Sequence, residues 1–178
     1  MVTPRITTLE DSYATGNWNN LFLGVWRGPV TIDGARVWGR EHERMAAAFP
    51  GGFASFVIVE KQVPIPDHPL RRALACGMDQ AGTSIRGMAG VQEAQGFAGA
   101  LFRSLQLALS SLASTPYPRK GFGSIPEAAA WIAPYLGAAP NHVSSQAVTE
   151  VAETFRQMIT APGASAEVPT PLSRRPRV

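Results

Sequence analysis

The run from Phe53 to Val63 constrains the fold more than any other part of this sequence. Its centre, Phe56-Val57-Ile58-Val59, is continuously apolar and largely β-branched. Such a run is typical of a strand at the centre of a sheet, because a strand with one solvent-facing side alternates apolar and polar residues. The rest of the chain must therefore cover this strand on both faces.

Further strand signals flank this central run. Alternating or β-branched segments bounded by Gly, Pro or Asn predict strands over 6–15, 53–63, 85–92 and 117–122, and a strand followed by a Gly28-Pro29 turn over 20–31. The first segment reads as an edge strand, with Gly16 and Asn17 marking a turn before Trp18. Pro118 confines the last strand to an edge of the sheet, or to the strand's first residues, because proline cannot donate to a ladder.

Helical periodicity and capping residues appear between these strands. Apolar residues at helical spacing predict helices over 34–49, 68–82, 93–114, 125–136 and 142–159. Thr31 or Asp33 can cap the first helix and Asp67 the second, since their oxygens accept from the unpaired amides of a first turn. Ser124 and Glu127 fit a capping box at the start of the fourth helix.

The order of these elements predicts an α/β fold. Strands joined through helices tend to run parallel, so we expect a mixed, mostly parallel sheet of four to five strands with helices packed on it, plus an extra C-terminal helix. We divide the chain into an α/β domain over 1–137, an additional amphipathic helix over 138–160 and a disordered, proline-rich basic tail over 161–178.

Composition excludes several classes of protein. The chain is 45% apolar and 16% charged, which suits a domain with a proper core, and its apolar stretches are too short to span a membrane. Cys76 is the only cysteine and Met1 to Glu10 lacks a secretory pattern, so we expect a cytoplasmic protein without disulfides. Three arginines of the last five residues carry the net charge of +3, so we predict no nucleic-acid partner.

Three segments together resemble the STAS domain (sulphate transporter and anti-sigma-factor antagonist), particularly its bacterial STAS/SEC14-like variants. They are Leu21 to Thr31 with its Gly28 turn, the strand Phe53 to Glu60, and Phe122-Gly123-Ser124-Ile125-Pro126-Glu127-Ala128-Ala129-Ala130-Trp131-Ile132. The resemblance covers about Ile6 to Leu136.

The resemblance also implies what to expect after the central strand. In phospho-regulated STAS proteins the matching strand ends in an acid, and a phosphorylatable serine begins the next helix. Glu60 keeps the acid, but Pro66-Asp67-His68-Pro69 contains neither serine nor threonine. We therefore expect no phosphorylation switch at this turn.

The remaining chemically interesting side chains stand alone. His42 lacks the second histidine that a helical zinc motif places four residues on, so we interpret it as a partly buried histidine on a helix face. Cys76 lies between Ala75 and Gly77, with no base nearby in sequence, so we predict that it packs as a small apolar residue. We predict no catalytic residue, no metal ligand and no cofactor.

Three functions remain open. The leading hypothesis is a noncatalytic protein-interaction or regulatory module whose partner is another protein, or a second copy of the chain. Its predicted binding residues surround the loop after the central strand, where α/β sheets bind ligands: Glu60, Pro66, Asp67, His68 and Arg71. The alternatives are a small-molecule binder or modest enzyme using Glu60, Asp67 and His68, and a self-assembling protein that uses its C-terminal helix.

Overall fold

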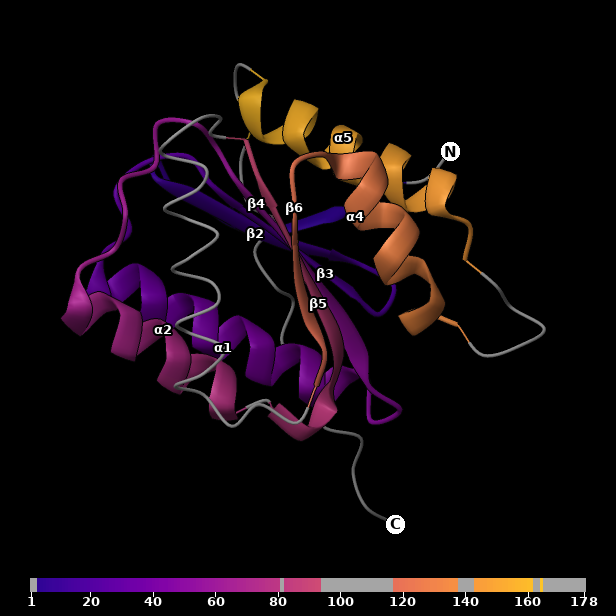
Figure 1. The fold of residues 1–178 in the computed structure, drawn as a ribbon, viewed down its shortest axis with the longest axis horizontal. Coiled ribbons are helices and arrows are strands. Elements are labelled where there is room, and N and C mark those ends of the chain that lie inside the picture. Colours follow the sequence, from indigo (N-terminus) through magenta and orange to yellow (C-terminus); the bar gives the residue numbers. More distant parts are fainter. Residues whose placement is uncertain (1–2, 81, 94–116, 138–142, 162–163, 165–178) are drawn as a thin grey trace, which may run out of the picture.

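The computed structural model describes residues 3–80, 82–93, 117–137, 143–161 and 164. In this part of the chain one sheet carries helices on both faces (Figure 1). The strands are β1 (Arg5–Leu9), β2 (Tyr13–Trp18), β3 (Leu21–Trp26), β4 (Phe53–Val59), β5 (Ile85–Gln92) and β6 (Arg119–Phe122). The helices are α1 (Ile32–Ala48), α2 (His68–Gln80), α4 (Ile125–Ile132) and α5 (Ser145–Thr160), with 3-10 turns at Gly82–Ser84 and Ala133–Tyr135.

The six strands lie in the sheet in their order along the chain. β1, β2 and β3 pair antiparallel, whereas β3, β4, β5 and β6 pair parallel. This arrangement confirms an α/β fold with a mixed sheet, with β4 in its interior and β6 at its edge. The strand count exceeds the predicted four to five, because the segment predicted as one N-terminal strand forms part of the β1–β2 hairpin.

The predicted turn at Gly16 and Asn17 is wrong. Both residues lie inside β2, where Gly16 pairs with Ile6 and Asn17 with Arg5. The turn comes later, and Asn19 there adopts a positive φ of 49°. A Cβ at Gly16 would collide with the Arg5 carbonyl oxygen and with a side chain of α5, so this glycine serves close packing.

The predicted starts of the other helices agree with the structure in part. Thr31 caps α1, since its Oγ1 accepts from the amide of Gly34 at 3.0 Å. Ser124 precedes α4 as expected but its side chain makes no cap hydrogen bond, so the predicted capping box is wrong. α5 begins later than predicted, because Ser144 caps it by accepting from the amide of Ala147 at 3.1 Å.

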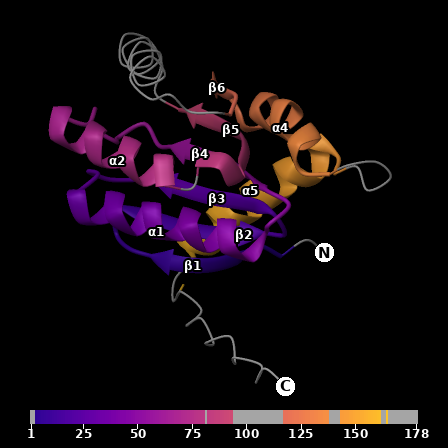
Figure 2. The same ribbon diagram turned by 90° about the horizontal axis from the view of Figure 1, so that it is seen from below.

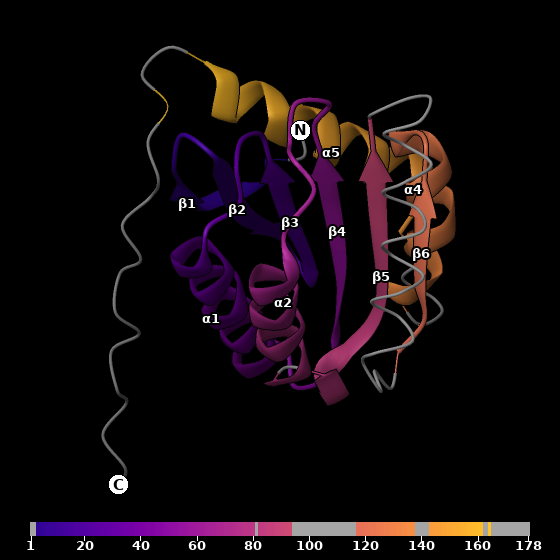
Figure 3. The same cartoon turned by 60° about the vertical axis from the view of Figure 1, so that its left-hand side comes forward.

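Two apolar layers enclose the sheet. α1 and α2 lie side by side on one face, and α4 and α5 cover the other (Figures 2 and 3). Five residues of α5 are buried in the core of its face: Val148, Val151, Ala152, Phe155 and Ile159. The additional C-terminal helix therefore docks on the domain as part of the same core, and its apolar stripe is covered within the chain. The predicted helix over 93–114, apart from Glu93, and nearly all of the predicted tail lie outside the described residues.

Candidate functional site

The predicted binding loop leads into α2, and its side chains mainly serve the start of that helix. The Asp67 carboxylate accepts from the amide of Leu70 at 3.0 Å, which confirms Asp67 as the cap. The Arg71 guanidinium donates back to the Asp67 carbonyl at 3.3 Å. Pro66 is buried, whereas Asp67 and His68 are exposed. The turn thus presents a carboxylate and an imidazole to solvent.

Glu60 belongs to a different set of contacts. Its amide continues the β3–β4 ladder by donating to the Trp26 carbonyl, and its carboxylate accepts from Gln62 at 2.6 Å. No hydrogen bond or ion pair joins Glu60 to Asp67 or His68 in the described part of the chain. The convergence of these three side chains that a small-molecule site requires is not seen there.

Strand alternation explains why Glu60 is separate. The alternation along β4 carries Glu60 to the same face as Ile58, which packs under α4 and α5. Arg27 follows β3 and Glu93 follows β5 at the matching positions of the neighbouring strands. We call Arg27, Glu60 and Glu93 the strand-end row.

Two members of the strand-end row, Arg27 and Glu93, contact the last turns of α5. Glu93 forms an ion pair with Arg156 at 2.8 Å, and the Arg27 guanidinium donates to the Ile159 carbonyl at 3.1 Å. The second contact places a cation at the negative end of the helix, where it satisfies a carbonyl that has no partner inside the helix. Sequence reasoning missed this row, although a charged residue directly after each apolar strand was a visible signal.

His42 is the most perturbed titratable group described. It is fully buried rather than partly buried, because its ring packs against Phe22, with ring centroids 4.1 Å apart. Nδ1 lies 2.9 Å from the Trp38 carbonyl, which can only accept, so Nδ1 carries the hydrogen. Nε2 then accepts from the Ser55 hydroxyl at 3.1 Å. Burial lowers the pKa of His42 to about 4, so the ring is neutral.

A serine bonded to a histidine is also the arrangement of a nucleophile and its base. Ser55 and His42 are both 0% exposed, and they lie between α1 and the sheet. A substrate has no route to Ser55 in this structure. The pair satisfies two buried polar groups in the core, which is the usual requirement for such groups.

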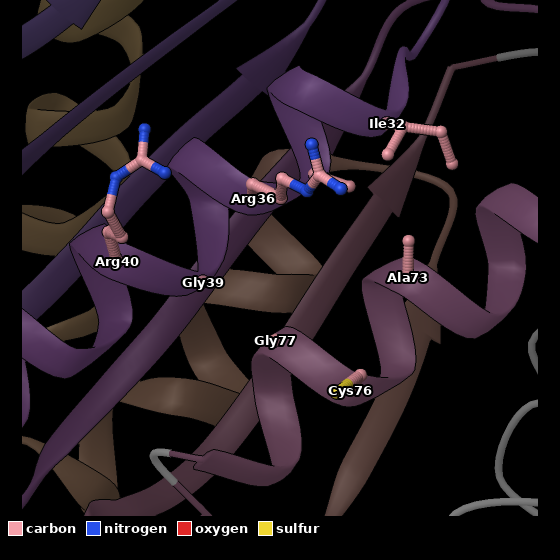
Figure 4. A pocket seen from close by; sticks show the side chains of 8 residues that line it. Ile32, Arg36, Gly39, Arg40, Ala73, Cys76 and Gly77 are labelled. Carbon is pink, nitrogen blue, oxygen red and sulfur yellow. The ribbon is translucent and has the colours of Figure 1, made fainter.

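A groove of about 320 Å³ runs along the outer surface between α1 and α2 (Figure 4). α1 supplies five of its lining residues: Ile32, Ala35, Arg36, Gly39 and Arg40. α2 supplies Ala73, Cys76 and Gly77. We call this feature the α1–α2 groove.

The structure contradicts the prediction that Cys76 packs in the core. The side chain is exposed on the rim of the α1–α2 groove. The face of α2 that packs inward carries Leu70 and Leu74 instead. At 100° per residue, Cys76 falls outside the stripe that these two leucines define. Cys76 is therefore open to reagents in solution.

Two large apolar side chains stand out on the described surface. Ile32 is 39% exposed and Ile65 is 40% exposed. Ile32 begins α1, and Ile65 lies in the loop that leads into α2, so both lie near the helix starts at the carboxyl ends of parallel strands. Contact surfaces of proteins contain apolar side chains surrounded by polar ones, and single exposed apolar side chains are also common on ordinary surfaces.

The chain matches no known protein-family model, no curated protein and no solved structure. Within the described residues, no helix combines the length and the apolar character needed to cross a bilayer. Among the same residues, no three His, Cys, Asp or Glu side chains gather as a metal site would require. The resemblance to STAS domains therefore rests on the sequence patterns alone.

Proposed function

We propose that this chain is a noncatalytic protein-interaction or regulatory module of STAS-like type, acting in the cytoplasm. The observation that carries the proposal is the exposure of Ile32 and Ile65 at the starts of α1 and α2. Ile65 comes two residues before Asp67 and His68, whose side chains face solvent. Interfaces combine such apolar anchors with a polar surround.

The resemblance to STAS domains also supports a functional role for this end of the molecule. The turn at Asp67 and His68 is the position at which STAS-like regulators are expected to carry a phosphorylatable serine. Here Asp67 occupies the helix cap with its carboxylate. The proposed regulation therefore acts through binding alone, with no kinase at this turn.

The test captures partners on the immobilised full-length chain and compares wild type with the double variant Ile32→Ser/Ile65→Ser. A protein that binds wild type saturably, and that rebinds after purification, should lose at least about tenfold in affinity with the double variant, because interface anchors contribute about 1–2 kcal/mol each. The matched control is Ala47→Ser/Ala48→Ser, which alters exposed positions at the opposite end of α1.

Two results would contradict the proposal. One is that no protein binds the wild-type chain saturably. The other is that every captured protein binds the double variant as tightly as it binds the control. Either result leaves the surface formed by Ile32 and Ile65 without a partner.

A further inference from the structure

The α1–α2 groove has a lining that suits one kind of occupant. We propose that it binds an amphipathic helix of a partner protein, with small apolar residues on the groove floor and carboxylates one turn apart facing Arg36 and Arg40. This inference rests on the proposed protein-binding function and specifies the chemistry of the partner.

The floor of the groove is backbone and small side chains. A Cβ at Gly39 would lie only 3.0 Å from the Cα of Gly77, so α1 and α2 touch there through their backbones. Ala35 and Ala73 also line the groove, and Figure 4 shows Ala73 on α2. The two helices meet there at glycines, so the ridge of a third helix can lie along the groove at this crossing.

The charged part of the rim is basic. Arg36 and Arg40 are exposed and lie one turn apart on α1. Arg40 makes no hydrogen bond or ion pair with any described residue, although its charge opposes the rise that burial causes in the pKa of Tyr13. The groove lining contains no acid. Arg36 contacts Asp33 at 3.0 Å, but their side chains are 67% and 88% exposed, so solvent screens that pair. Both guanidinium groups therefore remain able to bind carboxylates spaced one helical turn apart.

Because part of the rim is apolar, we infer that the occupant is amphipathic. The exposed Ile32 lies at one end of the groove and Cys76 on its α2 side (Figure 4). A partner that carried only acids would leave Ile32 in water. The basic tail of this chain is a poor occupant, because Arg174, Arg175 and Arg177 would repel the arginines of the rim.

Cys76 provides a direct readout, because it is the only cysteine in the chain and it lines the groove. The rate of Cys76 alkylation is measured on the full-length protein with two synthetic helical peptides of about five turns. Both peptides have the same alanine and leucine face. The acidic peptide flanks that face with glutamates one turn apart, and the basic peptide has lysines at those positions.

We expect the acidic peptide to slow Cys76 alkylation at least about fivefold and the basic peptide to leave it unchanged, with protection falling as salt rises. The double variant Arg36→Glu/Arg40→Glu should reverse the preference, so that the basic peptide protects Cys76. That reversal also shows that the variant is folded. The matched control, Lys61→Glu/Lys120→Glu, reverses two charges at exposed positions outside both helices and the groove lining, and it should behave as wild type.

The inference is overturned if the acidic peptide fails to protect Cys76, or if both peptides protect it equally. A small apolar carboxylate that protects Cys76 where the acidic peptide does not would make the groove a small-molecule site. If a captured partner requires Ile32 and Ile65 but leaves Cys76 alkylation unchanged, the protein-binding function stands and the groove is not its docking site.

Discussion

At the scale of single residues, the buried His42 makes the stability of the fold depend on pH. The ring is neutral in the folded protein, with a pKa of about 4, whereas an unfolded chain protonates it near 6.5. Between these values the unfolded state binds a proton that the folded state does not. The contribution of His42 to stability is therefore complete above pH 6.5 and is lost as the pH falls toward 4.

We expect the free energy of unfolding to fall by about 3 kcal/mol across that window through His42 alone. His42→Gln removes the titration and should flatten this part of the profile, although it lowers stability at neutral pH. Urea unfolding at a series of pH values measures both profiles. Profiles with the same slope for wild type and variant would show that His42 does not titrate in this way.

Gly24 is a second residue at which a close contact leaves no room for a side chain. It faces Trp38 of α1, and a Cβ there would overlap the indole ring. Trp38 in turn stacks on Trp26, with centroids 4.7 Å apart, so the ring cannot shift freely. We predict that Gly24→Ala destabilises the fold by about 1–3 kcal/mol through overpacking.

Gly123→Ala is the matched control, because a Cβ at Gly123 meets nothing within 4 Å. Thermal unfolding of the two variants beside wild type measures the difference. Equal midpoints for Gly24→Ala and Gly123→Ala would refute the close contact with Trp38.

At the scale of elements, the strand-end row determines how α5 is fixed to the sheet. The Glu93–Arg156 pair is 22% and 29% exposed, so water screens it less than a surface pair. A double-mutant cycle with alanine at both positions should give a coupling energy of about 1 kcal/mol in urea unfolding. The exposed Asp33–Arg36 pair is the control and should couple near zero. A coupling no larger than that of the control would show that the row does not hold α5.

The elements also show which structural features the sequence can predict. The strand over 85–92 and the caps at Thr31 and Asp67 follow from short-range signals, and the structure confirms them. The Glu93–Arg156 contact joins residues 63 positions apart, so its formation depends on where α5 docks. The full burial of His42 likewise depends on Ser55, which belongs to a different element. Local patterns carry no information about such pairings.

At the scale of the whole molecule, α5 completes the core over β1 and β3. A chain ending at Gly137 would expose the buried residues that meet Phe155 and its neighbours in that core. We predict that this truncated chain shows no cooperative thermal unfolding, because the loss of several buried apolar side chains is comparable to a typical stability of about 5–15 kcal/mol. Calorimetry and light scattering test this together. A cooperative transition at the wild-type temperature would contradict it, and would return α5 to consideration as an assembly element.

The sequential order of the strands has a consequence for how the protein is made. As the chain leaves the ribosome, each new strand can add beside the one before it, so β1 to β6 can assemble in the order of synthesis. The helix that covers β1 and β3 comes last, and its contact with Arg27 closes a span of 132 residues. Until that helix emerges, the N-terminal hairpin carries a bare apolar face, and nascent chains should be most dependent on chaperones during this interval.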